Sequence, residues 1–271
     1  KEPILPLYLF KNHTFSLTSA LGAVIGAGMF GAIIMLPLYF QVVRGYSATE
    51  AGLKLIPLML GIVSTSIVSG KMISKHGHYK RFPIMGTAIM TVGILLMTRL
   101  EIDTSYWQIS IYAIMVGAGL GLSMQTIVIA LQNAVEFKDM GIATSSNTFF
   151  RSLGSVFGTA IFGSILTNRV SHYMASGFGD LAKTNPSALA GFDTSQLATL
   201  TNNTAMLKTF PPVIKNTALE AFVNSFHVVF YAAAPVTLLG LVLAFMLRET
   251  PLRTTQDYAA AREDAAGESL G

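Results

Sequence analysis

Five long apolar stretches constrain the fold more than any other feature, because each is long enough to cross a lipid bilayer. About 20 helical residues span the hydrocarbon core of a membrane. A sixth, shorter stretch lies between polar segments and is interpreted as another span. The sequence therefore predicts an all-α integral membrane protein built as a six-transmembrane-helix bundle within residues 1–247. The expected spans are about 16–41, 51–70, 82–100, 107–131, 141–166 and 226–247.

The composition agrees with a surface that faces lipid. Only 12% of the 271 residues are charged and 52% are hydrophobic, whereas soluble domains carry about 25% charged residues. Cysteine is absent, which excludes disulfides and thiolate metal sites, and we expect neither a metal nor a cofactor. The net charge of +4 comes from short clusters between apolar stretches. This distribution predicts contact with membrane lipid and not with nucleic acid.

The distribution of cations predicts the orientation. Residues 71–81 contain Lys71, Lys75, Lys80 and Arg81 without an acidic residue, so the positive-inside rule places this loop in the cytoplasm. Six spans then put both chain ends in the cytoplasm, including a polar tail at 248–271. The 59 residues 167–225 become an extracellular loop. We expect a multi-pass protein of the cell (plasma or inner) membrane, and a chain that begins at Lys1 is interpreted as lacking an N-terminal part.

The positions of the acidic residues bear on whether this chain could couple transport to protons. All 14 lie in loops, in the tail or at span ends, although a proton-coupled pump needs a titratable group within the membrane. The predicted spans offer only His227. A coupling acid would therefore lie outside these residues. The chain has no HExxH, GxSxG or phosphate-binding loop motif, so we expect no enzyme and no catalytic residues.

A few polar side chains fall within the predicted spans, where they are costly unless they face protein or a wet cavity. The candidates for a substrate cavity are Gln41, Gln125, Asn147 and Arg151. Thr144, Asn147, Arg151, Gly154 and Gly158 share one helical stripe. Two interpretations of Arg151 remain open. It contacts a lipid headgroup or a backbone carbonyl, or it lines the cavity.

Small residues and turn signals predict how the helices begin and pack. Ser47 and Glu50 match a capping box for the second span, after a turn at Gly45, and Gly77 predicts a tight turn in the cytoplasmic loop. Glycines four residues apart let helices approach closely in lipid. Three such pairs are expected to pack helices together, namely Gly22 with Gly26, Gly117 with Gly121, and Gly154 with Gly158.

Four stretches carry a family resemblance: MLPLYFQVVRGYSATEAGLKLIPL at 35–58, GKMISKHGHYKR at 70–81, and the segments 117–135 and 141–163. Together they resemble the C-terminal half of a major facilitator superfamily transporter, in particular the 14-span drug:proton antiporter branch with the EmrB/QacA-type exporters. Residues 70–81 are similar to a decayed copy of the superfamily's cytoplasmic loop, with Ser74 in place of its acid. The matching loop positions are Gly70, Lys75, Gly77, Lys80 and Arg81.

The resemblance implies two six-helix bundles that rock about a central cavity, of which this chain supplies one. It implies proton-coupled export of lipophilic drugs or related small molecules. The expected partners are the N-terminal bundle of the same polypeptide, a small-molecule substrate and protons. An exporter of one endogenous metabolite, such as a siderophore or an antibiotic, is the main alternative. A non-transporting membrane receptor or scaffold is a further one.

Overall fold

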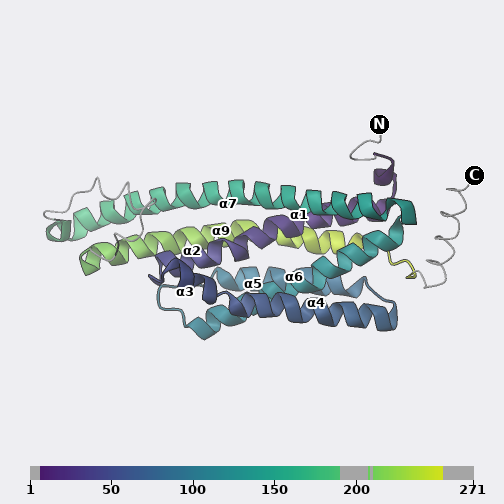
Figure 1. The fold of residues 1–271 in the computed structure, drawn as a ribbon. Helices are drawn as coiled ribbons and strands as arrows, with labels where there is room; N and C mark the ends of the chain where they lie inside the picture. Colours follow the sequence, from purple (N-terminus) through teal and green to yellow (C-terminus); the bar gives the residue numbers. More distant parts are fainter. Residues whose placement is uncertain (1–6, 190–206, 208–209, 253–271) are drawn as a thin grey trace, which may run out of the picture.

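The computed structural model describes residues 7–189, 207 and 210–252, and every regular element among them is helical. The all-α prediction is therefore confirmed for this part of the chain. The long helices lie side by side along a common direction (Figure 1). The elements are η1 (Leu7–Lys11), α1 (His13–Ile33), α2 (Met35–Val42), α3 (Ala48–Leu53), α4 (Ile56–His76), α5 (Arg81–Met97), α6 (Tyr106–Ala134), η2 (Phe137–Asp139), α7 (Met140–Thr184), η3 (Pro186–Leu189) and α9 (Pro212–Met246).

The described helices include four segments that are long and apolar enough to cross a membrane. They are Ala48–His76, Tyr106–Ala134, Phe137–Thr184 and Pro212–Met246, and α5 is a shorter apolar helix. The two ends of the bundle are named here by their connections. The proximal end joins α4 to α5 and α6 to α7, and the distal end joins α2 to α3 and α5 to α6.

Two prolines divide spans that the sequence predicted as continuous helices. The expected span 16–41 is broken at Ile34 into α1 and α2, three residues before Pro37. The expected start at residue 51 is replaced by the short α3, followed by α4 with Pro57 in its first turn. Proline lacks the N–H for the bond to the carbonyl four residues earlier and clashes with that carbonyl. Each helix break therefore lies a few residues before the proline, Pro37 or Pro57.

The expected extracellular loop at 167–225 is largely helical where it is described, which corrects its boundaries. The helix α7 continues to Thr184 and α9 already begins at Pro212. Leu166, Val170, Met174 and Phe178 repeat every four residues and are buried. They belong to the same hydrophobic core as Ile214, Ala218 and Phe222 of α9. This one-sided pattern stabilises a helix in polar surroundings, and α7 and α9 extend together beyond the other helices (Figure 1).

Glycines set the close approach of α7 to α1. A side-chain carbon added at Gly154 would overlap the Ala23 carbonyl, and one at Gly158 would lie 2.9 Å from the Ala27 Cα. From the other side, Gly26 leaves room for the backbone of α7 at Arg151. This proximity lets the Ser155 hydroxyl donate to the Gly26 carbonyl at 3.1 Å.

The pairing of α4 with α6 follows the same principle. Gly117 faces the Leu58 carbonyl, and Gly121 faces the Ile62 carbonyl and the Thr65 hydroxyl. Thr65 in turn donates to the Ala118 carbonyl at 3.0 Å. The bundle is thus held by helix pairs in backbone contact, with hydroxyl groups bonded to carbonyls of the neighbouring helix.

Candidate functional site

The main candidate site is a shallow cleft at the proximal end between α6 and α7, with a mostly apolar lining that includes a few polar side chains. Its volume is about 550 Å³. We call it the α6–α7 cleft, and its lining residues are Gln132, Met140, Gly141, Thr144, Ser145 and Thr148. The Gln132 amide donates to the Thr144 hydroxyl at 3.2 Å, which links the two walls. The hydroxyls of Thr144, Ser145 and Thr148 donate to carbonyls of α7. Their oxygens can still accept, so the cleft offers a ligand a few directional partners between apolar walls.

Arg151 and Gln125 lie further along the two helices of the cleft, towards the distal end. Arg151 follows Thr148 by three residues and is half-buried, and Gln125 precedes Gln132 by seven residues and is exposed. Residues at these spacings lie on the same side of a helix. Within the described residues, the Arg151 guanidinium has no hydrogen bond or ion pair. Its five N–H donors thus remain for a ligand or another part of the protein.

The loop acids nearest to the cleft in sequence already have other partners. Glu136 pairs with Lys138 at 2.8 Å, and the Asp139 carboxylate accepts a hydrogen bond from the Tyr8 hydroxyl at 2.7 Å. That hydrogen bond is the main reason that the pKa of Tyr8 is raised above its ordinary value. The hydrogen bond from Lys138 to Glu136 likewise raises the lysine pKa. Glu136 and Asp139 are therefore poor candidates for the counterion of Arg151.

Asn147 does not line the cleft, although the sequence suggested it as a cavity residue. It is 2% exposed, and its amide nitrogen donates to the Thr18 carbonyl of α1 at 2.9 Å. Gly154 and Gly158 on the same stripe also face α1. The stripe predicted from the sequence is therefore divided between two surfaces of α7. Asn147, Gly154 and Gly158 pack against α1. Thr144 lines the α6–α7 cleft, and Arg151 lies beside that cleft.

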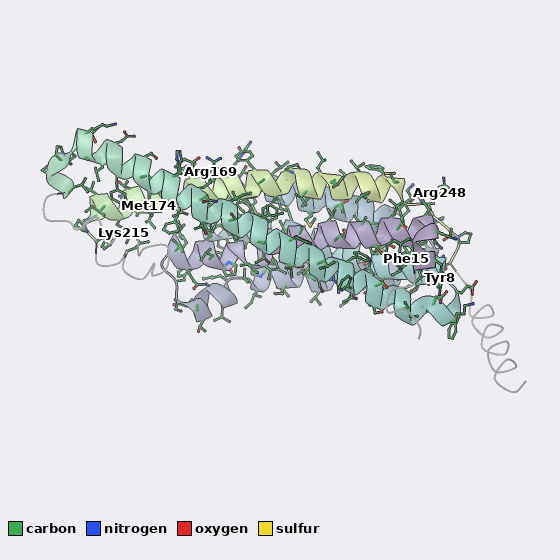
Figure 2. All side chains as sticks on the ribbon, turned by 90° about the horizontal axis from the view of Figure 1, so that it is seen from above. Tyr8, Phe15, Arg169, Met174, Lys215 and Arg248 are labelled. Atoms are coloured by element: carbon green, nitrogen blue, oxygen red, sulfur yellow. The ribbon has the colours of Figure 1, made fainter. Side chains whose placement is uncertain are left out.

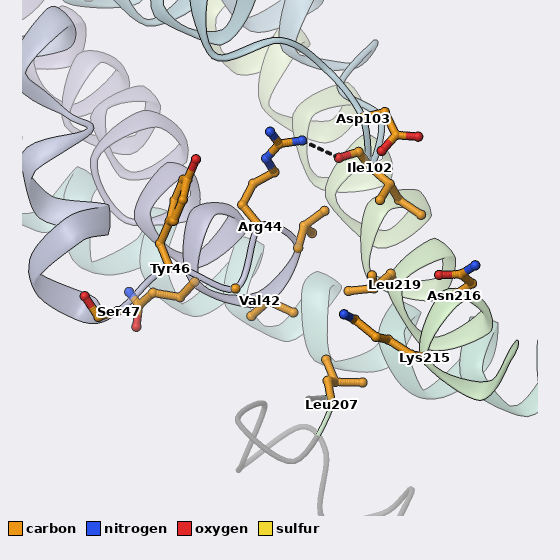
Figure 3. Close-up of a pocket in the computed structure, with 13 residues that line it drawn as sticks. Val42, Arg44, Tyr46, Ser47, Ile102, Asp103, Leu207, Lys215, Asn216 and Leu219 are labelled. Atoms are coloured by element: carbon orange, nitrogen blue, oxygen red, sulfur yellow. Dashed lines mark hydrogen bonds between the residues drawn. The ribbon is translucent and has the colours of Figure 1, made fainter. Parts of the chain in front are cut away.

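Gln41 lies far from the α6–α7 cleft, in a recess at the distal end. This distal recess has a volume of about 740 Å³ and is formed by the α2–α3 turn, the α5–α6 loop, α9 and Leu207. Arg44 donates to the Ile102 carbonyl at 2.7 Å, and Lys215 reaches from α9 towards Val42 (Figure 3). The view of all side chains also places Lys215 and Met174 at one end, away from Tyr8, Phe15 and Arg248 (Figure 2). Of the four cavity candidates, Gln125 and Arg151 therefore lie on the two helices of the α6–α7 cleft, whereas Asn147 packs against α1 and Gln41 lies in the distal recess.

His227, the titratable residue of the predicted spans, also lies towards the distal end. Its Nε2 atom is within hydrogen-bond distance of the Leu100 carbonyl oxygen, which ties α9 to the α5–α6 loop. Together with Glu101, Asp103 and Glu220 it borders a cavity of about 400 Å³. The described residues contain no group of three or more His, Asp or Glu side chains arranged to hold a metal ion.

The loop at 70–81 is held by a segment that follows α9, which sequence reasoning missed. Gly77 ends α4 with φ 74°, as its predicted turn requires. Glu249 accepts a hydrogen bond from the Tyr79 backbone N–H at 3.0 Å and lies 3.2 Å from His78. An acid from elsewhere in the chain thus contacts the loop in which Ser74 replaces the expected acid. About 170 residues separate these partners, and no local pattern could have found them.

The other residues of the loop motif lie at the end of α4 or at the start of α5. Gly70 and Lys75 belong to α4, Lys80 is the N-cap of α5, and Arg81 is the first residue of α5.

The capping box of Ser47 with Glu50 is confirmed, with both reciprocal hydrogen bonds present. Gly45 has φ 67°, consistent with the predicted turn.

Comparisons with known proteins add a family context to this geometry. The model of the Major Facilitator Superfamily matches residues 1–159. A "Tetracycline resistance determinant" of Streptomyces rimosus is 30% identical, over 100% of this chain and 82% of its own length. The "Multidrug transporter protein MdtP" of Bacillus subtilis is 34% identical, over 97% of this chain and 51% of its own length.

An uncharacterized MFS-type transporter of Mycobacterium tuberculosis is 35% identical over 99% of this chain. This chain covers only 36% of that relative. The chain thus spans 36% of the length of the Mycobacterium tuberculosis relative, 51% of the Bacillus subtilis relative and 82% of the Streptomyces rimosus relative.

Proposed function

Because the chain belongs to the major facilitator superfamily, we propose that it forms one helical bundle of an exporter for lipophilic drugs or related small molecules. Members of this family are transporters and not enzymes. The names of two relatives, a multidrug transporter and a tetracycline resistance determinant, support export as the activity. We further propose that the chain contributes six crossings, corresponds to the C-terminal half of a 14-span drug:proton antiporter, and has its proximal end in the cytoplasm.

The observation that carries the proposal is the α6–α7 cleft. Its Gln132 amide and the hydroxyls of Thr144, Ser145 and Thr148 lie in a mostly apolar lining. Arg151 follows Thr148 by three residues on the same helix. Broad exporters bind varied compounds between apolar walls with few directional partners. The cleft would form one wall of a central cavity and open alternately to the two sides as the bundles rock.

The uncovered surfaces of α4 and α7 support a second bundle as the partner. In the most apolar 18-residue stretch of each of the segments that contain α4 and α7, 22% of the residues are buried inside the structure, compared with 61% for α6. Val63 and Ile67 of α4, and Val156 and Phe157 of α7, are among the exposed apolar side chains. Lipid covers part of such surfaces, and we propose that the remainder of the polypeptide covers the rest. The proton-coupling acid would lie in that remainder.

Drug susceptibility of a deletion strain tests the proposal in the full-length gene. We expect increased sensitivity to several lipophilic compounds of different structure, restored by the wild-type gene. Sensitivity to a single compound, or accumulation of one endogenous product, would instead favour the dedicated metabolite exporter. Unchanged sensitivity to all compounds, with no product accumulated, would contradict export and leave a receptor or scaffold as the better explanation.

A further inference from the structure

We propose that the distal recess binds an amphipathic anion, with a phosphate or carboxylate group held between Arg44 and Lys215. The recess has a volume of about 740 Å³. Its walls come from separate parts of the fold, namely the α2–α3 turn, the α5–α6 loop, the distal part of α9 and Leu207. The proposal concerns a site outside the α6–α7 cleft and goes beyond the export of drugs.

The recess contains several hydrogen-bond donors that a ligand could use. Arg44 carries five N–H donors, and its hydrogen bond to the Ile102 carbonyl uses one nitrogen, Nη1. Lys215 is half-buried, and its ammonium has no hydrogen bond or ion pair within residues 7–189, 207 and 210–252. The side-chain amide of Asn216 adds a further donor, whereas that of Gln41 already donates to the Pro37 carbonyl at 3.3 Å. A ligand that supplies several acceptor oxygens would satisfy these groups.

The charges of the lining favour an anion. Arg44 and Lys215 each carry a positive charge, and Asp103 is the one acidic residue that lines the recess. One positive charge therefore remains uncompensated within the lining. A planar guanidinium binds phosphate and carboxylate through paired hydrogen bonds, and an ammonium adds a point charge beside it.

The apolar part of the lining and its position indicate the rest of the ligand. Val42 and Leu219 are buried lining residues, which suit an apolar group next to the anionic one. The α5–α6 loop leads directly into Tyr106 and Trp107 at the start of α6, and Trp107 is 77% exposed. Exposed Trp and Tyr at the end of a spanning helix mark the level of lipid headgroups. A phospholipid headgroup and a soluble organic anion both have the required chemistry.

Thermal unfolding of the purified full-length protein tests the proposal, because a ligand that binds the folded state raises the Tm. The probes are dioleoylphosphatidylglycerol, the zwitterionic dioleoylphosphatidylcholine, and inorganic phosphate. We expect the anionic lipid to raise the Tm more than the zwitterionic lipid. Lys215→Gln should weaken its apparent affinity by about tenfold or more, the effect of losing one charged hydrogen bond. Arg44→Gln should add to this loss.

Lys183→Gln is the matched control, because Lys183 is an exposed lysine near the end of α7 whose ammonium lies 3.5 Å from Asp180. This variant should respond to lipid like the wild type. Lys215 has the advantage that its replacement breaks no hydrogen bond among the described residues, so a folded variant is expected. If inorganic phosphate alone gives the Lys215-dependent shift, the site binds soluble anions. An unchanged response of both recess variants to all three probes would overturn the proposal.

Discussion

Arg151 is the residue on which the proposed transport role depends most. It is half-buried beside the α6–α7 cleft, and the loop acids Glu136 and Asp139 are already bonded elsewhere. In the full-length protein we expect Arg151→Ala to reduce the initial rate of efflux by about tenfold or more, as for loss of a charged hydrogen bond. Arg151→Lys should retain part of the rate, since it keeps the charge but loses the planar fork.

Efflux of a fluorescent substrate from intact cells measures this effect, with membrane abundance and Tm checked for each variant. A folded Arg151→Ala protein with wild-type efflux would show that the guanidinium contacts only a headgroup or a backbone carbonyl.

Asn147 is predicted to act on stability. Asn147→Ala removes the bond to the Thr18 carbonyl that joins α7 to α1, and interhelical bonds of this kind contribute about 0.6–2 kcal/mol in membranes. We expect a lower Tm for the full-length protein in detergent. Asn168→Ala is the control, because Asn168 is exposed and, among the residues that the structure describes, its side chain bonds within α7, to Ser164. Equal Tm values for the two variants would contradict the assigned role of Asn147.

At the level of helices, the α1–α7 contact requires a glycine at position 154. Gly154→Ala would place a methyl group against the Ala23 backbone, and such overpacking costs about 1–3 kcal/mol. Gly163→Ala on the same helix has open space around the added carbon and should be neutral or stabilising, because alanine is the better helix former. Thermal unfolding of both variants measures the difference. A Gly154→Ala protein as stable as Gly163→Ala would disprove the close contact.

The helices were predictable from the sequence to the extent that local patterns determine them. The capping box at Ser47 and the turn at Gly77 follow from a few neighbouring residues, and both are confirmed. The extension of α7 to Thr184 was missed because average hydropathy falls after residue 166. Its four-residue repeat of buried side chains, from Leu166 to Phe178, was nevertheless visible in the sequence.

Over the whole molecule, the contacts that place the candidate site join residues far apart in the chain. Asn147 meets Thr18 across 129 residues, and Tyr79 meets Glu249 across 170. No periodicity or spacing encodes such pairs, so the stripe through Asn147 and Arg151 could not be separated into a packing surface and a cleft edge before the fold was known.

A single bundle has no second bundle to rock against, and all 14 acids lie outside the predicted spans. We therefore expect residues 1–271, reconstituted alone in liposomes, to give no substrate-dependent proton flux under conditions in which the full-length protein gives one. A pH-sensitive dye inside the liposomes records this flux. Substrate-dependent flux from residues 1–271 would show that one bundle suffices.

Substrate efflux from proteoliposomes of the full-length protein, measured with and without an inward proton gradient, tests proton-coupled export most directly. We expect chemically diverse lipophilic compounds to leave faster when the outside is acidic, and nigericin, which dissipates the gradient, to abolish the acceleration. Efflux that is unaffected by the gradient for every compound would contradict proton-coupled export.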